Sequence, residues 1–262
     1  MGSATTQALA ASTQALAAAS GVSIDTAREL FAAARAVGDS SQLSGALADP
    51  AAARAARQNV VAAVFGGFSP STQSVLKTVV AERWSSAADL VDGIEELAIR
   101  ATAIAEPASD LEGELFGFSR VIAANPELEL ALGSRLGDED AKGALVEKLL
   151  AGGAGAGTTL IVSSLVRRPR ERRVRQLLTR ATNIVSSQRG RVVATVHSAT
   201  PLSDAQRTRL SSALSSRYDG EVSLNVVIDP AVVGGLRVQI ADDVIDGSIA
   251  ARLADLRQKL AG

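Results

Sequence analysis

The segment 190–262 constrains the fold of this 262-residue chain more than any other part, because its apolar residues follow strand periodicity between turn residues. Residues 222–226 and 236–240 alternate apolar and polar side chains, which is the period of a half-buried strand. Asp229-Pro230 starts a turn, and Gly234-Gly235 supplies backbone freedom before the second run. The pattern predicts strands over 192–196, 222–228, 236–240 and 244–245.

Two helices are predicted to accompany these strands. Ser203 and Gln206 form a capping box that opens a helix over 203–218. Ser248 can cap a last helix, whose apolar residues from Ile249 to Leu260 are spaced as one helical stripe. The segment is therefore expected to form a small α/β domain in which one face of a sheet is buried under two helices.

The first two thirds of the chain contain an internal repeat. A shift of 85 residues places Glu29 on Glu114 and Leu47 on Leu132, and apolar positions coincide over a long ungapped stretch. Beyond Arg83 the shift becomes 87, so that Leu97 falls on Ile184. Only two copies are present, which indicates a doubled domain.

Helix punctuation recurs in both copies. Asp49-Pro50 and Asp138-Glu139 are expected to open the third helix of each copy, while Ser69-Pro70 and Asn125-Pro126 open others. Glu106-Pro107 predicts a break between the copies. We therefore expect a mainly α chain with a small C-terminal α/β domain, divided into helical bundle copy one (1–105), helical bundle copy two (106–189) and the α/β domain (190–262).

Composition excludes several classes of function. Hydrophobic residues make up 47% of the chain but aromatics only 3%, so Ala, Val and Leu must form the core. A net charge of −1 gives no general attraction for nucleic acid or anionic membrane. The absence of cysteine excludes disulfides and thiolate chemistry. No apolar run reaches the roughly 18 to 20 residues that span a bilayer, so no membrane insertion is expected.

No cofactor, metal site or catalytic residue is predicted. The glycine-rich stretch 152–157 has Thr158 where a phosphate-binding loop needs lysine, and we interpret it as a connector between helices. His197 is the single histidine and lacks an evident acid partner or fellow ligands, so a residue at a strand end is the preferred interpretation.

The basic cluster Arg167–Arg175 leaves two interpretations open. It can be a solvated or acid-binding protein surface, or it can bind nucleic acid. Aromatic residues that stack on bases are absent nearby, which favours the first interpretation. Nucleic-acid binding remains the alternative function, and nucleotide binding at the 152–157 loop is a third.

The C-terminal segment resembles the signature of the delta subunit of F-type ATP synthases, called OSCP in mitochondria. The resemblance covers roughly residues 110–262, and its matching residues include 190–196, 228–230, 233–236, 238, 243–248 and 252–253. Ala241-Asp242 stands where the family usually has Gly-Asp, so that turn is expected to differ in type. Copy two resembles the bundle of the family, and copy one an extra bundle typical of long actinobacterial forms. The signature residues are Asp229, Gly234, Gly235, Ile245, Asp246 and Ser248.

The resemblance implies a non-catalytic stator in the peripheral stalk. Such a subunit links the alpha/beta catalytic head to the b stalk, so that the head does not rotate with the central shaft during proton-driven ATP synthesis. Its expected location is the cytoplasmic face of the bacterial plasma membrane, where partner subunits hold it.

The resemblance also implies two interfaces, although a place in the core is the preferred interpretation for each of their apolar residues. The N-terminal helix of an alpha subunit is expected in a groove between the first and fifth helices of a bundle, and the C-terminus of b on the α/β domain. Copy one can bind a second alpha subunit, brace b or only thicken the stalk; we favour bracing. The candidate residues are Leu160, Ile161 and Leu165 or their copy-one equivalents Val75, Leu76 and Val80 for alpha, and Leu253, Leu256 and Leu260 for b.

Overall fold

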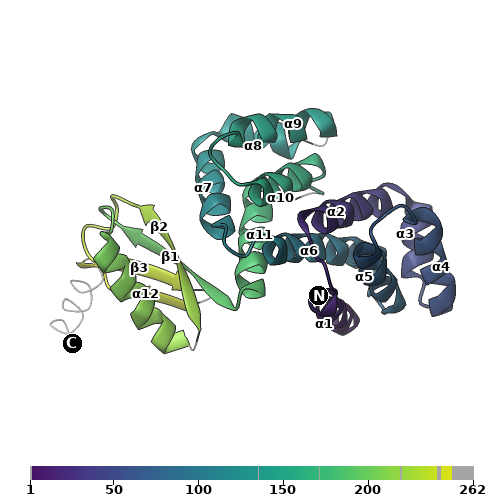
Figure 1. Cartoon of the computed structure of the whole chain (residues 1–262). Helices are drawn as coiled ribbons and strands as arrows, with labels where there is room; N and C mark the ends of the chain where they lie inside the picture. The colour runs from purple at the N-terminus through teal and green to yellow at the C-terminus, as the bar shows by residue number, and fades with distance from the viewer. Residues whose placement is uncertain (1, 135, 171, 219, 241–242, 250–262) are drawn as a thin grey trace, which may run out of the picture. The chain divides into compact units, whose positions relative to one another are not determined.

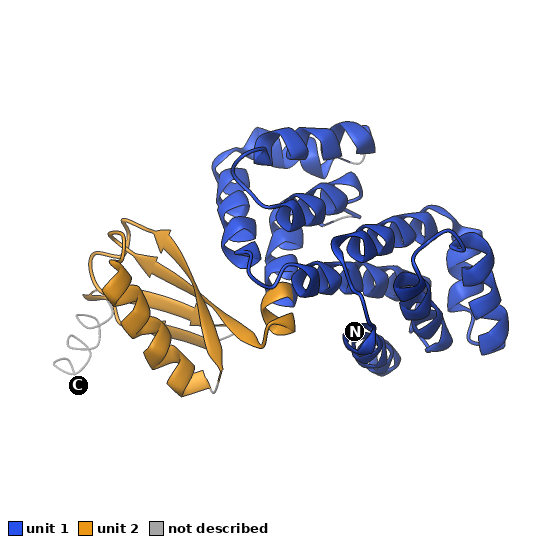
Figure 2. Ribbon diagram, viewed as in Figure 1, with its two compact units in different colours: residues 1–184 blue, residues 185–262 orange. Residues whose placement is uncertain are grey.

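The computed structural model describes residues 2–134, 136–170, 172–218, 220–240 and 243–249. The chain forms two compact units, residues 1–184 and 185–262 (Figure 2). The first is helical and the second contains the sheet, so the expected fold class, mainly α with a small C-terminal α/β part, is confirmed. The boundary between the units falls inside a helix. The division of the helical part at residue 105 stays a prediction.

Copy one of the repeat consists of short helices, four of which begin at a serine side-chain cap. Ser23, Ser40, Ser69 and Ser86 each accept a hydrogen bond from the backbone N–H three residues later, as helix N-caps do. The helices are α1 (Ser3–Ala18), α2 (Ile24–Asp39), α3 (Ser41–Ala48), α4 (Arg54–Val64), α5 (Pro70–Ala81) and α6 (Ala87–Ala105) (Figure 1).

Copy two repeats these helix bounds. A shift of 85 residues carries the bounds of α3 onto Pro126–Gly133, and those of α4 to within one residue of Glu139–Leu150. The helical boundaries thus follow the repeat predicted from apolar positions. The helices of copy two are α7 (Leu111–Ala124), α8 (Pro126–Gly133), α9 (Glu139–Leu150), α10 (Ala156–Arg167) and α11 (Val174–Gln188).

Helix α6 belongs to both copies. A shift of 87 carries its first residue, Ala87, onto Val174, which begins α11, so α6 is the last helix of copy one. A shift of 85 carries α1 onto residues 88–103, inside α6, so α6 is also the first helix of copy two. The buried stripe of α1 agrees with the second match, because each of its residues lands on a buried position of α6. The stripe is Thr5, Ala8, Ser12 and Leu16, and it maps onto Leu90, Gly93, Leu97 and Ala101.

The core of the helical unit is built mostly from aliphatic side chains, with a few aromatic ones. Trp84 is buried and donates a hydrogen bond from Nε1 to the carbonyl oxygen of Val79, 2.9 Å away. Its ring fills the space over Gly93, where a Cβ would come within 2.2 Å of the ring. Trp84 is therefore part of the core.

The second unit contains a four-stranded sheet in the order β2-β1-β3-β4. β1 and β2 are parallel and are joined by α12 (Asp204–Tyr218), while β3 and β4 add antiparallel strands. Leu214 of α12 packs on Ala194, Val196, Val238 and other inward residues of the sheet. The strands are β1 (Arg191–Ser198), β2 (Glu221–Ile228), β3 (Leu236–Ile240) and β4 (Asp243–Asp246), in agreement with the predicted runs.

Both predictions of a third helix are wrong in position. Asp138 caps α9, but α9 is the fourth helix of copy two counted from α6. Asp49-Pro50 does not open the third helix of copy one; the helix that follows is the fourth, α4, and it begins at Arg54. The Asp49 carboxylate instead accepts a hydrogen bond from the Ala51 N–H at 2.8 Å, which closes a local turn. The predicted turn at Ala241-Asp242 and most of the predicted last helix, 250–262, lie outside the described residues.

Candidate docking surfaces

The glycine-rich stretch 152–157 lies in a helix connection, and His197 lies near a strand end. The glycine-rich stretch 152–157 joins α9 to α10, as expected for a connector. His197 lies near the end of β1, with Nδ1 3.6 Å from an oxygen of Asp229. Within the described ranges, no group of three or more His, Asp or Glu side chains could hold a metal ion, and no helix is long and apolar enough to cross a bilayer.

The basic cluster Arg167–Arg175 is mostly paired with acids from other helices. Arg170 lies 2.7 Å from both Asp92 and Glu95 of α6. Of the six arginines described in this cluster, five form ion pairs and Arg173 forms none that the structure records. The other pairs are Arg167 with Asp140 and Glu147, Arg168 with Asp39 and Glu139, Arg172 with Asp92 and Glu95, and Arg175 with Glu129.

This pairing removes the basis of the nucleic-acid interpretation. A protein surface gains affinity for nucleic acid when its free cationic side chains neutralise phosphates and so release the counterions bound to them. Here the cations are already neutralised by acids that are distant in the sequence but adjacent in the fold. The cluster therefore joins the end of α10 and the α10–α11 connection to α2, α6, α8 and α9 through ion pairs.

The residues predicted to contact an alpha subunit lie mainly in the protein interior. Ile161 and Leu165 of α10 are buried, and only Leu160 is half-buried. Their copy-one equivalents on α5, which are Val75, Leu76 and Val80, are all buried. α5 and α10 are indeed the fifth helices of the two copies, but these side chains pack inward.

The first helices of the two copies differ in exposure. Twelve of the nineteen residues of α6 are buried, and between Leu90 and Ala103 only Asp92 and Arg100 keep partial exposure. α2 packs along α6, and at its end Asp39 forms an ion pair with Arg168 beside α10. The α6–α10 face of copy two is therefore covered by a helix of copy one.

Helix α1 has the opposite environment. Only four of its sixteen residues are buried, and it packs against α5 and α6. The helix contains no charged side chain and consists mostly of alanine, serine, threonine and glutamine, with Leu9 and Leu16 as its leucines. Leu9 is half-buried beside the buried stripe. The outer flanks of α1 therefore present a neutral surface of small side chains next to α5.

Carboxylates cap the fifth helix in both copies. Glu29 accepts hydrogen bonds from the Ser69 N–H and hydroxyl at 2.7–3.1 Å and from Thr72 at the start of α5. Partial burial acts to raise the pKa of Glu29, but the hydrogen bonds from Thr72 and Ser69 outweigh it and hold that pKa below its usual value. Glu114, its repeat equivalent, accepts from the Gly155 N–H at 2.8 Å at the start of α10.

Comparison with known proteins identifies the family. The model of the ATP synthase delta (OSCP) subunit family matches residues 97–260. ATP synthase subunit delta of Leifsonia xyli subsp. xyli is 48% identical over the full length of both chains. This chain belongs to the ATP synthase delta (OSCP) subunit family. The subunit delta of Streptomyces avermitilis is 40% identical over 91% of this chain and 89% of its own length.

The delta-family signature residues set backbone shape in the second unit. Gly235 has φ 82°, and a Cβ there would lie 2.5 Å from the carbonyl oxygen of Gly247. Asp229 caps its turn by accepting from the Ala231 N–H, and Asp246 accepts from the Ser248 N–H. Hydrogen bonds from Ser248 lower the pKa of Asp246. The remaining members are Gly234, with φ 159°, and Ile245, which packs on the sheet core.

Sequence reasoning missed two surface features of this delta-family chain. The open flanks of α1 were not singled out, because an alanine-rich helix has no apolar stripe that distinguishes its faces. The exposed Leu130 was also missed, although the repeat carried a signal: its copy-one equivalent is Gly45. The predicted b contacts Leu253, Leu256 and Leu260 lie outside the described residues.

Proposed function

We propose that this chain is a non-catalytic peripheral-stalk subunit of the F-type ATP synthase. It links the alpha/beta catalytic head to the b stalk, so that the head does not rotate with the central shaft during proton-driven ATP synthesis. Membership of the delta family supports this proposal. The chain works without a cofactor at the cytoplasmic face of the bacterial plasma membrane, where its partner subunits hold it.

The head binds copy one in this proposal. The N-terminal helix of an alpha subunit packs its apolar face against the groove between α1 and α5, as amphipathic helices pack into apolar grooves. The observation that carries this choice is the contrast between α1, with four buried residues, and α6, with twelve. A helix already surrounded by its own chain offers no surface to a partner. This choice replaces stalk bracing as the preferred role of copy one.

Titration calorimetry of the full-length chain with a peptide of the alpha-subunit N-terminus tests the proposal. At about 100° per residue, Leu9 and Ala15 lie on opposite flanks of the buried stripe of α1. One of these two flanks faces the peptide. The substitution on that flank, either Leu9→Glu or Ala15→Glu, is expected to weaken binding at least tenfold, or about 1.4 kcal/mol. Leu160→Glu on α10 is the matched control and is expected to leave binding unchanged.

The outcomes separate the two copies. Binding lost only in Leu160→Glu would move the head groove to copy two. No binding by the unmodified chain would remove the head-binding proposal. Circular dichroism of each variant verifies that the helical content is retained, so that a loss of binding is not a loss of fold.

The b subunit binds the C-terminal α/β unit in this proposal. The resemblance assigns the C-terminal end of b to this part, with Leu253, Leu256 and Leu260 as contacts. A chain ending at residue 249 is expected to lose binding to the purified soluble part of b while it still binds the alpha peptide. Full retention of b binding would exclude these leucines as the principal contacts.

A further inference from the structure

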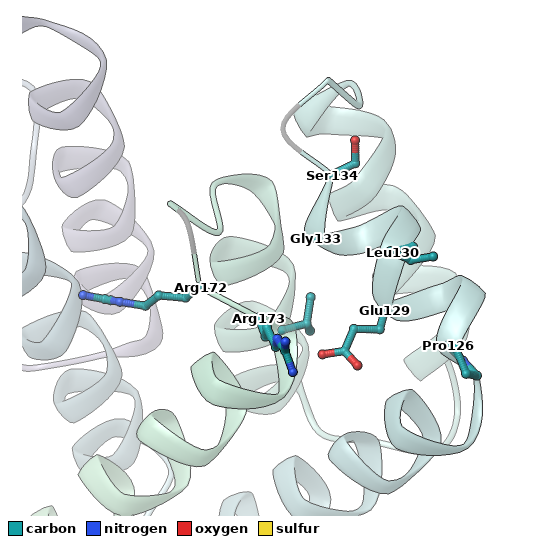
Figure 3. A pocket seen from close by; sticks show the side chains of 8 residues that line it. Pro126, Glu129, Leu130, Gly133, Ser134, Arg172 and Arg173 are labelled. Atoms are coloured by element: carbon teal, nitrogen blue, oxygen red, sulfur yellow. The ribbon is translucent and has the colours of Figure 1, made fainter.

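A pocket of about 790 Å³ lies beside α8 in the helical unit. Pro126, Leu130 and Gly133 of α8 form one wall, and Arg173 and Val174 at the start of α11 form the other. Figure 3 shows Arg173 and Glu129 pointing toward one another across this space, while Arg172 extends away from it. The pocket is thus apolar at its walls and carries one cation and one carboxylate.

The two charged groups of the pocket differ in their pairing. Arg173 is exposed and forms no ion pair among the described residues, whereas its five arginine neighbours do. Oε2 of Glu129 accepts from Arg175 at 2.9 Å, so this carboxylate is already paired within the bundle. Arg173 is therefore the charged group of the pocket that a partner can pair with.

Exposed leucines extend the apolar surface beyond the pocket. Leu130 on its wall is 75% exposed, and Leu136 in the following connection is 99% exposed. Large apolar side chains grouped next to a pocket with polar groups are typical of a protein interface. A small ligand would use the pocket but would not cover Leu136, so the extent of this surface favours a macromolecular partner.

Copy one lacks this arrangement. The repeat equivalents of Glu129 and Leu130 are Ser44 and Gly45, and a shift of 87 places Ser86 opposite Arg173. The charged and apolar groups of the pocket are therefore particular to copy two. Exposed leucines contribute nothing to the stability of the bundle that carries them, so the duplication alone does not account for them.

We propose that the α8 pocket binds an amphipathic helix of another ATP synthase subunit, which inserts an apolar side chain flanked by a carboxylate. The apolar side chain fills the pocket between Leu130 and Val174. The carboxylate pairs with the exposed guanidinium of Arg173. The inference rests on the proposed assembly of this chain into the synthase, but it uses a different surface from the α1–α5 groove.

Photo-crosslinking in the assembled ATP synthase tests the proposal. The full-length chain carries p-benzoylphenylalanine in place of Leu130, and the crosslinked peptide is identified by mass spectrometry. We expect a helical segment of another subunit that contains an acidic residue beside an apolar one. A second sample with the photoreactive residue in place of Val64, an exposed apolar side chain on α4, sets the background.

Charge reversal provides the second arm of the test. Arg173→Glu is expected to reduce the crosslink yield at position 130 at least tenfold, and Arg173→Gln to reduce it less. Arg54→Glu, a reversal at an exposed arginine of α4, is the matched control and should leave the yield unchanged. Binding of the alpha peptide to the α1–α5 groove should persist in all three variants, so a failure here is distinguishable from a failure of the proposed function.

Three results would overturn the inference. The first is a yield at position 130 no higher than the background. The second is a crosslink to another copy of this chain or to a peptide without an acidic residue. The third is a crosslink that Arg173→Glu leaves undiminished, because the cation would then have no part in recognition.

Discussion

The two copies of the helical repeat have matching helix bounds but different surroundings. α1 begins copy one with most of its surface open, whereas α6 begins copy two enclosed on nearly all sides. The difference arises because α6 is also the last helix of copy one and is covered by α2. A duplication that shares a helix cannot keep two equivalent first-helix grooves, so the copies are free to bind different partners.

The first prediction tests whether both copies depend on α6. Leu97→Ala removes a fully buried side chain from the shared helix and is expected to lower the free energy of unfolding by about 2–5 kcal/mol. Because α6 contacts both copies, hydrogen exchange should become faster in α2 and in α10 together. Urea denaturation and exchange mass spectrometry measure the two effects.

Leu132→Ala on α8 is the matched control for that experiment. Leu132 is also fully buried but belongs to copy two alone. Its effect on hydrogen exchange should be stronger in α9 and α10 than in α2. If Leu97→Ala accelerates exchange in one copy only, then α6 does not couple the two copies.

The second prediction concerns the ion pairs that bind the α10–α11 connection to α6. Glu95 is almost buried and faces three guanidinium groups, from Arg170, Arg172 and Arg180. Glu95→Gln removes its charge and is expected to cost about 1–3 kcal/mol, less than a fully buried pair because the arginines are partly exposed. Thermal and urea unfolding measure the loss.

An exposed ion pair in copy one provides the control. Asp25 and Arg28 form an (i, i+3) pair whose side chains are 73% and 61% exposed. Asp25→Asn is expected to change stability by less than about 1 kcal/mol. Equal effects of the two substitutions would mean that the buried network is no stronger than a surface pair, and that copy two is held to α6 by apolar packing alone.

Local patterns predicted the elements of this fold better than they predicted its surfaces. Local patterns predicted all four strands, and Ser69-Pro70 and Asn125-Pro126 predicted helix starts, because these signals depend on adjacent residues. The Asp49-Pro50 prediction was wrong since the same residues also stabilise a turn. The ion pairs of Arg168 and Arg170 could not be predicted, because Asp39 and Glu95 are distant in sequence.

The candidate interface shows the same limit. The alpha-subunit candidates of copy one form an apolar stripe on the fifth helix. Such a stripe marks the face that packs into the core as readily as a face that lines a groove. The candidates are Val75, Leu76 and Val80, and all three are buried. Which face stays open depends on neighbouring helices. α1 and α6 occupy the same place in the repeat, yet α6 is also covered by α2 and α3.

The third and smallest prediction compares the caps of the fifth helices. Glu29 caps α5 through hydroxyl and backbone donors, and its pKa is lowered from 4.5 in the folded chain. A carboxylate with a lowered folded pKa stabilises the fold above its unfolded pKa and loses that contribution as the pH falls through the folded value. The difference in unfolding free energy between the unmodified chain and Glu29→Gln should therefore be full near pH 7 and shrink below about pH 4.

Urea denaturation at pH 7 and at pH values down to 3.5 measures this difference. Glu127→Gln, at an exposed position in the first turn of α8, serves as the control and should give a smaller gap at pH 7. Hydroxyl groups of Ser69 and Thr72 donate to the cap of α5. At the start of α10, Glu114 and Glu106 accept from the backbone N–H groups of Gly155 and Gly157. The difference in unfolding free energy between the unmodified chain and Glu29→Gln could instead stay constant with pH. That result would show that the Ser69 and Thr72 hydroxyls bind the neutral side chain equally well, and the caps of the two copies would then be equivalent.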